Sequence, residues 1–219
     1  MSKSKEMRKS PRLSHILELE DFEGLTAELQ SWRTDKYVQT TELKKGSGLV
    51  LGFVKGLRLS ARLIYAIRKN LSTTSLEVDW GHLLDKDGMS LSPECDIIIH
   101  KKGYVREWNG NSNPVMNFKF IKSTDTIAVI SCKSYAKSID KPYKAYCERI
   151  REYVNNVMLF AECCPKRRAV ALNEKAKKAG YKGFWYLYSV DEQTNETCKD
   201  PKVWENFLRT LKKVCGARN

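Results

Sequence analysis

A continuous apolar run in the middle of the chain places the strongest constraint on the fold. Thr126-Ile127-Ala128-Val129-Ile130 contains no polar alternation, and it ends at the polar sequence Ser131-Cys132-Lys133. Such a run of β-branched and aliphatic residues is typical of a strand that is buried on both faces. We therefore expect residues 126–130 to form a central strand of a sheet that is flanked by helices.

The remaining sequence alternates between helical and extended patterns. Apolar residues at helical spacing predict helices over residues 13–32, 49–71, 142–163 and 201–214. Short apolar or alternating runs predict strands over residues 76–80, 95–99, 116–120, 168–172 and 183–189, with a hairpin-type turn at 85–88 and a Gly- and Asn-rich loop at 103–114. Residues 1–12 are expected to be a disordered basic tail. We expect residues 13–219 to form one α/β domain with an N-terminal helical part (13–72), a core (73–190) and a mixed central sheet.

The charge of the chain indicates a polyanionic partner. The sequence holds 39 Lys and Arg against 26 Asp and Glu, a net charge of +13. Such an excess raises the local concentration of polyanions and their association rate. Nucleic acid is the partner that we expect, although charge alone also suits a well-solvated basic protein or one that lies near anionic lipid.

The cysteines and the hydropathy pattern indicate a cytoplasmic protein. The seven cysteines form no CxxC pair and have no histidine at the spacing of a zinc site, so they are expected to be reduced core thiols. No apolar run approaches the roughly 20 residues that span a bilayer, and no apolar signal segment follows the basic N-terminus. We expect no membrane association.

Two polar residues stand at strand ends in a pattern that carries chemistry. Asp96 lies in Pro93-Glu94-Cys95-Asp96-Ile97-Ile98-Ile99, and Lys133 follows the predicted central strand. These segments, in the order of strands and helices given above, resemble the PD-(D/E)XK nuclease superfamily over roughly residues 57–160. The resemblance implies a restriction-endonuclease-like core. It also implies that Asp96 holds Mg²⁺, or Mn²⁺, and that Lys133 orients the nucleophile or offsets charge at phosphorus.

The sequence departs from the family at the middle motif position, where Ser131 replaces a carboxylate. Restriction endonucleases that cut sites built around CCGG have Ser-x-Lys here and take the missing Glu from the following helix. The resemblance to this branch implies Glu148 as the second metal ligand, and Glu94 is the alternative because residues two apart on a strand share a face. Glu148 is otherwise a solvated residue that pairs with Arg149 or Arg151. Cys132, inside the motif, is a further candidate ligand, but a small buried side chain on the opposite face is the competing interpretation.

The segment after Lys133 is expected to contact DNA. Lys137-Ser138-Ile139-Asp140-Lys141 is similar to an Arg-x-Asp-Arg element that reads bases in the same branch, although Lys cannot make the bidentate fork of Arg. Basic and aromatic residues around it form a rim suited to phosphates. The expected DNA contacts are Tyr135, Lys137, Asp140, Lys141, Lys144 and Arg149.

These features predict a Mg²⁺-dependent DNA endonuclease. A type II restriction or other defence enzyme that acts as a homodimer fits best, since cutting both strands of a duplex calls for two sites related by a two-fold axis. The competing hypothesis is a DNA-binding module whose nuclease site has decayed at Ser131. A third is an RNA-processing nuclease or a subunit of a larger defence complex.

Overall fold

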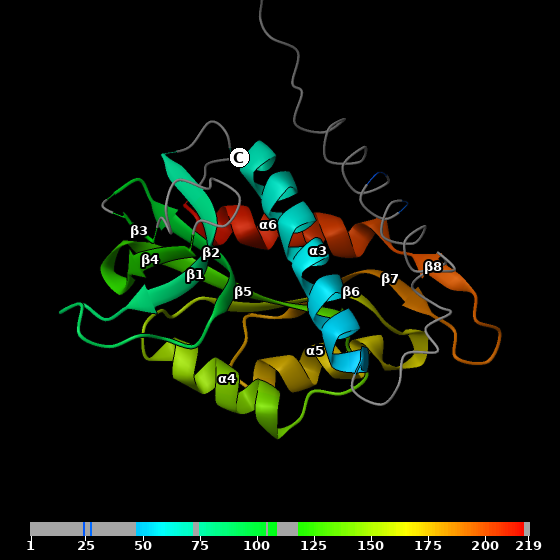
Figure 1. The fold of residues 1–219 in the computed structure, drawn as a ribbon. Helices are drawn as coiled ribbons and strands as arrows, with labels where there is room; N and C mark the ends of the chain where they lie inside the picture. Colours follow the sequence, from blue (N-terminus) through cyan, green and yellow to red (C-terminus); the bar gives the residue numbers. More distant parts are fainter. Residues whose placement is uncertain are drawn as a thin grey trace, which may run out of the picture.

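The computed structural model describes residues 47–71, 75–103, 105–108 and 118–216, together with the single residues Gly24 and Ala27. The tail predicted for residues 1–12 and, apart from these two single residues, the helix predicted for residues 13–32 lie outside this part of the chain. Within it, helices flank one mixed sheet (Figure 1). The predicted α/β class is confirmed.

Eight strands form the sheet in the spatial order β3-β4-β1-β2-β5-β6-β7-β8. The central strands β5, β6 and β7 are parallel, and β2 and β8 run antiparallel to their neighbours β5 and β7. The sheet is therefore mixed, and the predicted central strand lies inside it as β5. The strands are β1 Leu76–Leu84, β2 Cys95–Lys101, β3 Val105–Trp108, β4 Phe118–Lys122, β5 Thr126–Tyr135, β6 Val157–Pro165, β7 Phe184–Val190 and β8 Thr197–Lys199.

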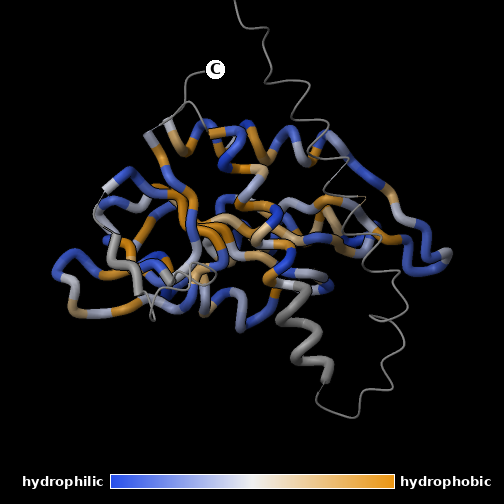
Figure 2. Tube along the Cα trace, turned by 45° about the horizontal axis from the view of Figure 1, so that its top comes forward, coloured by the Kyte–Doolittle hydropathy of each residue, from blue (hydrophilic) through white to orange (hydrophobic). Residues whose placement is uncertain are grey.

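Two helices cover each face of the sheet. Helices α3 (Ser47–Asn70) and α6 (Pro201–Val214) enclose one apolar cluster with the sheet, and α4 (Lys141–Arg151) and α5 (Ala169–Lys178) enclose the other (Figure 1). Hydrophobic residues concentrate in the central strands, while hydrophilic residues occupy the loops and outer surfaces (Figure 2).

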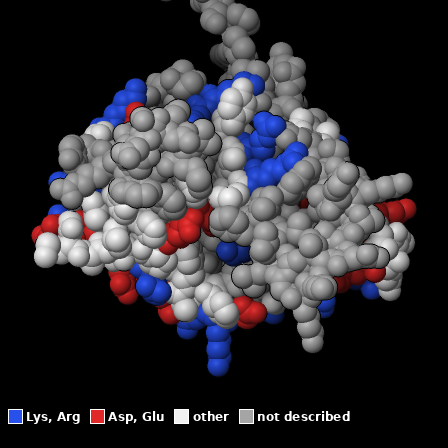
Figure 3. Space-filling model, viewed as in Figure 1, with Lys and Arg blue, Asp and Glu red and all other residues white. Residues whose placement is uncertain are grey.

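Lys and Arg side chains gather along α3 on the face seen in Figure 3. Single turns of 3₁₀ helix occur at Ser123–Asp125 and Lys166–Arg168.

The helix predicted for residues 201–214 is confirmed as α6. The Asp200 side chain caps it by accepting a hydrogen bond from the Lys202 backbone nitrogen at 3.2 Å, and Pro201 stands in its first turn. Its apolar stripe is buried against the sheet through Trp204, Phe207, Leu208 and Leu211. The prediction for residues 49–71 is likewise confirmed as α3.

One predicted helix is too long, and one predicted strand has the wrong type. The helix predicted for residues 142–163 ends at Arg151, and every residue of Val157–Pro165 is buried in strand β6. A short apolar run that is buried on both faces cannot be distinguished from a buried helix by periodicity alone, which explains the error. The strand predicted for residues 168–172 lies almost entirely in α5, and β3 occupies part of the predicted loop 103–114.

Gly81 allows β4 to approach β1 closely. Its φ is +143°, and a Cβ atom at this position would lie 2.0 Å from the carbonyl oxygen of Lys119. The register between β1 and β2 shifts between Asp79 and Gly81. The close approach and the positive φ therefore both require glycine.

Gly81→Ala is expected to lower the free energy of unfolding by about 3 kcal/mol, because backbone strain and a steric clash with β4 add together. Urea unfolding followed by circular dichroism measures the change. Gly88→Ala is the control, since Gly88 has a φ of +73° but no heavy atom within 4 Å of an added Cβ. The control should lose about 1 kcal/mol. Equal losses in the two variants would show that the approach of β4 contributes nothing.

All seven cysteines are free, and five of them are buried, as expected for reduced core thiols. Among the residues that the structure describes, no helix combines the length and hydropathy needed to cross a membrane.

Candidate active site

The start of β2 and the end of β5 lie side by side at a cavity of about 310 Å³. The two strands are antiparallel with Ile97 opposite Ile130, so the residues just before Ile97 face those just after Ile130. This register brings the two halves of the motif together although they are far apart in the sequence. The cavity is lined by Gly56 and Leu57 of α3, Glu94 and Asp96, Cys132, Lys133, Ser134 and Tyr135 of β5, and Tyr146 of α4.

Hydrogen bonds from β5 fix the carboxylate of Asp96 in this cavity. Its Oδ2 accepts from the backbone nitrogen of Cys132 at 2.7 Å and from the Ser131 hydroxyl at 3.4 Å. Burial raises the pKa of Asp96, and the positive charge of Lys133 together with these hydrogen bonds offsets only part of the effect. The charged carboxylate is therefore under-compensated in the protein alone, and a bound cation would stabilise it.

Lys133 brings a positive charge to the same cavity. Its Nζ lies 5.8 Å from the centre of the Tyr143 ring of α4, and its charge favours the ionised form of Asp96. A cation near an aromatic face is held by the ring quadrupole, which restrains the flexible lysine stem. The structure thus places Asp96 and Lys133 at the same cavity.

Glu94 lines the cavity beside Asp96. The Tyr146 hydroxyl donates a hydrogen bond to the Glu94 carbonyl oxygen at 3.0 Å, which ties the start of β2 to α4. Burial raises the pKa of Tyr146 well above its ordinary value, so this phenol remains a neutral donor. Glu94 therefore stands on an anchored segment, and its side chain is exposed and able to accept a ligand.

Glu148 is not among the residues that line the cavity. Its side chain is 60% exposed, and its Oε1 lies 3.6 Å from Lys144 Nζ of the same helix. The neighbouring Cys147 is fully buried against the sheet, and the next residue along an α-helix is turned by about 100°, which directs Glu148 outward. The expectation that Glu148 joins Asp96 is thus not met, and Glu148 pairs with Lys144 instead of Arg149 or Arg151.

Ser131 and Cys132 occupy the two faces of β5. Ser131 is buried and donates to Asp96, so the hydroxyl lies next to the Asp96 carboxylate. The Cys132 side chain belongs to the apolar cluster under α3, and burial raises the pKa of its thiol well above the ordinary value. A neutral thiol is a poor ligand for a hard cation, which favours the packing role of Cys132 over metal binding.

The predicted DNA-contacting residues lie at the end of β5 and on α4. Tyr135 lines the cavity and is 36% exposed. Lys137, Asp140, Lys141, Lys144 and Arg149 are all exposed on the connection to α4 and on the helix itself. The Ser138 hydroxyl donates to Asp140 at 3.3 Å, which orders the turn before the helix.

A second polar group, which sequence reasoning missed, lies between β1 and β2. The candidate ligand atoms of Glu77, Asp79 and His100 are within 4.8 Å of one another, so the group could bind a metal ion. The negative charge of Asp79 is already compensated by its neighbours. Its oxygens lie 2.9 Å from Arg68, 3.0 Å from His100 Nε2 and 3.8 Å from Lys119 Nζ. Although burial raises its pKa, the His100 hydrogen bond and the charges of Lys119 and Arg68 leave the pKa of Asp79 below its ordinary value. The alternation of Glu77 and Asp79 on one strand was the available signal.

Sequence reasoning also missed the buried carboxylate of Glu162 on β6. It accepts a hydrogen bond from the Tyr188 hydroxyl of β7. Residue 162 fell within a predicted helix, and the apolar run that begins at Val157 was the signal for a strand.

No known family model and no curated protein matches the sequence. Among solved structures, the chain is similar to NucC from P. aeruginosa ATCC27853 and NucC from E. coli MS115-1, both in the cAAA-bound form. The TM-score is 0.57 in each case, with 12% and 10% identity; the alignments cover 94% of this chain and 91% and 90% of the NucC chains. At such identity the likeness concerns the fold alone, and it supports the α/β fold.

Proposed function

We propose that the protein is a divalent-metal-dependent DNA endonuclease of the PD-(D/E)XK type that acts in a restriction or other defence system. One observation carries the proposal: Asp96 and Lys133, from two strands, line the same cavity. The net charge of +13 supports a polyanionic substrate, and the likeness to NucC supports the superfamily.

The residues of the cavity fit a hard cation such as Mg²⁺ or Mn²⁺. Asp96 and Glu94 offer carboxylate oxygens, which these ions prefer, and the burial of Asp96 favours a nearby positive charge. When bound, such a cation polarises a phosphoryl oxygen and lowers the pKa of an attacking water. The Cys132 backbone N–H fixes the position of the Asp96 oxygen, and Ser131 adds a hydroxyl without charge. We infer that Glu94, rather than Glu148, is the second carboxylate.

Lys133 and the rim supply the remaining functions. The Lys133 ammonium is suited to balance the charge that develops on phosphorus as the nucleophile attacks. Lys137, Lys141 and Arg149 are exposed on the connection from β5 to α4 and on α4 itself, where they can neutralise phosphates and hold the duplex in register. Two copies related by a two-fold axis would place one such site on each strand, so we propose a cytoplasmic homodimer.

The proposal is tested by incubating the purified protein with supercoiled plasmid, linear duplex DNA and RNA. Each substrate is assayed with Mg²⁺, Mn²⁺ or EDTA, and with or without cAAA, since both NucC neighbours were solved with cAAA. Cleavage of DNA with metal but not with EDTA is expected. Metal-dependent cleavage of RNA alone would replace the DNA assignment, and cleavage in EDTA would refute the metal-dependent mechanism.

DNA binding is expected to weaken strongly with salt, because log affinity falls by about 0.9 for each phosphate contact per tenfold rise in salt concentration. Lys141→Ala should reduce this slope by roughly one contact, measured by fluorescence anisotropy of a labelled duplex in EDTA. Lys213→Ala is the matched control, since Lys213 is exposed on α6, on the opposite face of the sheet. An equal reduction in both variants would indicate that only net charge matters and that α4 forms no specific rim.

Ser131 favours one alternative, a DNA-binding module whose nuclease site has decayed. Its hydroxyl bonds Asp96 at the position where the family has a metal-binding carboxylate. This alternative predicts that DNA binding does not depend on metal. It also predicts that the plasmid stays intact with every divalent cation.

A further inference from the structure

Among the residues that the structure describes, none pairs with the outer edge of strand β7 over its first half. β8 pairs with Tyr188, Ser189 and Val190 of β7 and with no earlier residue of that strand. Residues 184–187 therefore pair with β6 on one side only. An uncovered strand edge presents backbone donors and acceptors that another chain can use.

The outward backbone groups of this edge can be assigned from the hydrogen bonds that precede it. The Gly183 carbonyl oxygen accepts from Leu159 of β6, so the N–H of Phe184, in the same peptide unit, points away from β6. Asn173 Oδ1 of α5 accepts from this N–H at 3.0 Å. By the alternation of an extended strand, the outward groups that follow the Phe184 C=O are the N–H and C=O of Tyr186. Within residues 47–216 as far as they are described, no hydrogen-bond partner for these two groups is found.

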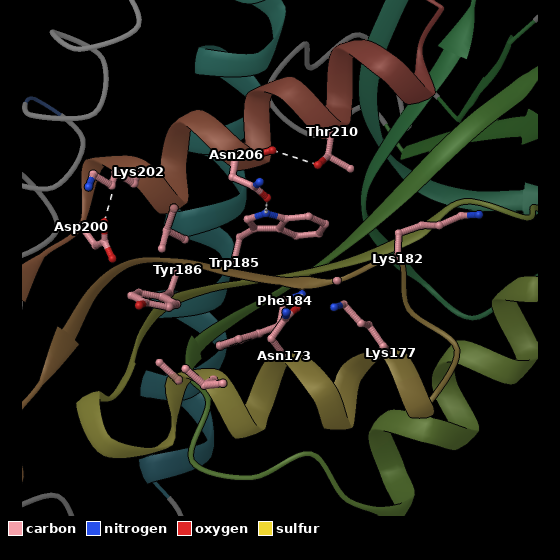
Figure 4. A pocket seen from close by; sticks show the side chains of 14 residues that line it. Asn173, Lys177, Lys182, Phe184, Trp185, Tyr186, Asp200, Lys202, Asn206 and Thr210 are labelled. Carbon is pink, nitrogen blue, oxygen red and sulfur yellow. Dashed lines mark hydrogen bonds between the residues drawn. The ribbon is translucent and has the colours of Figure 1, made fainter.

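A cavity of about 550 Å³ runs along this edge between α5 and α6 (Figure 4). The two helices form its walls. On the α6 side, Trp185 Nε1 donates to Asn206 Oδ1 at 2.9 Å, and on the α5 side Asn173 holds Phe184 (Figure 4). Buried or half-buried backbone groups are normally paired, so a groove of this shape beside the unpaired Tyr186 groups points to an added strand.

The charge of the groove indicates which kind of peptide could bind there as an added strand. Lys182 before β7 and Lys202 of α6 line it, together with Lys177 of α5, which pairs with Glu174 at 3.0 Å; Asp200 is the single carboxylate among the lining residues. A symmetric pairing of two copies through β7 would bring these lysines against their own equivalents, which is unfavourable. An acidic segment would find complementary charge on both walls.

We propose that the open edge of β7 binds an extended acidic peptide of a partner protein, which pairs with Tyr186 as an additional strand between α5 and α6. No residue that lines this groove lines the active-site cavity. The binding therefore does not depend on the function proposed above.

The test uses the full-length protein and the fluorescein-labelled peptide acetyl-Thr-Glu-Val-Asp-Val-Thr-amide. Its β-branched residues favour an extended chain and its carboxylates match the lysines. Anisotropy should show saturable binding that is lost in a peptide of the same sequence whose alternate backbone nitrogens are methylated, because methylation removes the donors of the strand pair. Amide exchange followed by NMR should show that the Tyr186 amide exchanges faster than those of Trp185 and Leu187 in the free protein, and that the peptide slows it.

A pair of charge reversals separates the groove from general electrostatics. Lys177→Glu with Lys202→Glu should weaken peptide binding by about tenfold or more. Lys178→Glu with Lys213→Glu changes the charge equally on the same two helices, at exposed residues outside the groove, and should change binding by less than about twofold. Thermal unfolding checks that both variants fold.

Three results would overturn the proposal. Equal binding of the methylated peptide would show that the backbone edge is not used. A concentration-dependent dimer in which the Tyr186 amide is protected without peptide would assign the edge to a second copy. Displacement of the peptide by single-stranded DNA, together with insensitivity to methylation, would identify the groove as a phosphate site.

Discussion

Asp96→Asn is expected to abolish DNA cleavage and, at neutral pH, to make the folded protein more stable. The rate should fall by about a hundredfold or more, because the variant loses the half-buried carboxylate that would hold the metal. Stability should rise because burial raises the pKa of Asp96 above the ordinary value of 3.8, so the folded state disfavours the charged form. Asparagine removes the charge but keeps an oxygen that can accept from the Cys132 N–H.

The pH dependence of this gain has a definite sign. A carboxyl group whose pKa is raised on folding contributes most favourably below its unfolded pKa, and this contribution is lost as the pH rises through the folded pKa. The variant should therefore melt higher than the parent at pH 7, and the difference should vanish near pH 3.5. For a chain of this size, 1 kcal/mol corresponds to about 2 to 4 °C.

Plasmid cleavage and thermal unfolding at both pH values measure the two effects of Asp96→Asn. Asp87→Asn, in the exposed turn after β1, is the control and should change neither. A variant that cuts like the parent would remove Asp96 from the site. A lower melting temperature at pH 7 would mean that the carboxylate is well compensated without metal.

Glu94→Gln is expected to reduce cleavage by about tenfold or more, whereas Glu148→Gln should cut like the parent. Glu94 lines the cavity with Asp96, and Glu148 is exposed and paired with Lys144. Losing one of two carboxylates weakens the hold on a hard cation. Each substitution preserves side-chain size, so differences in rate at limiting Mg²⁺ report on the charge.

Ser131→Glu in the Glu94→Gln background gives the reciprocal test. This substitution puts a carboxylate on β5, next to Asp96 of β2, at the position where PD-(D/E)XK nucleases have one. It should recover part of the cleavage. Circular dichroism confirms that the variant folds with a charge at this buried position. Loss of cleavage in Glu148→Gln with none in Glu94→Gln would reinstate Glu148 as the ligand and require α4 to rotate when DNA binds.

The sequence predicted the elements whose patterns are unambiguous. Residues 126–130 are apolar without interruption and lie inside the sheet, and residues 201–214 have a capping Asp, an early Pro and a regular apolar stripe. The contact of Asp96 with the end of β5 could be predicted, because Asp96 lies where one buried strand begins and Lys133 lies where another ends. These features depend on local patterns and on one antiparallel register.

The features that sequence reasoning missed depend on tertiary context. The run from Val157 to Pro165 is buried on both faces, and such burial hides the period that would separate a strand from a helix. The choice between Glu94 and Glu148 depends on the rotation of α4, which Cys147 fixes by packing against the sheet. The group of Glu77, Asp79 and His100 forms only through the register of β1 with β2, in which Glu77 lies opposite His100.

Asp96 is proposed to hold a divalent cation in the cavity between β2 and β5. Titration of the DNA-free protein with Mn²⁺, followed by electron paramagnetic resonance, tests it without reference to activity. We expect one Mn²⁺ per chain that is displaced by Mg²⁺, absent in Asp96→Asn and retained in Glu77→Gln. Mn²⁺ binding that survives in Asp96→Asn and disappears in Glu77→Gln would exclude Asp96 as the ligand and place the metal between β1 and β2.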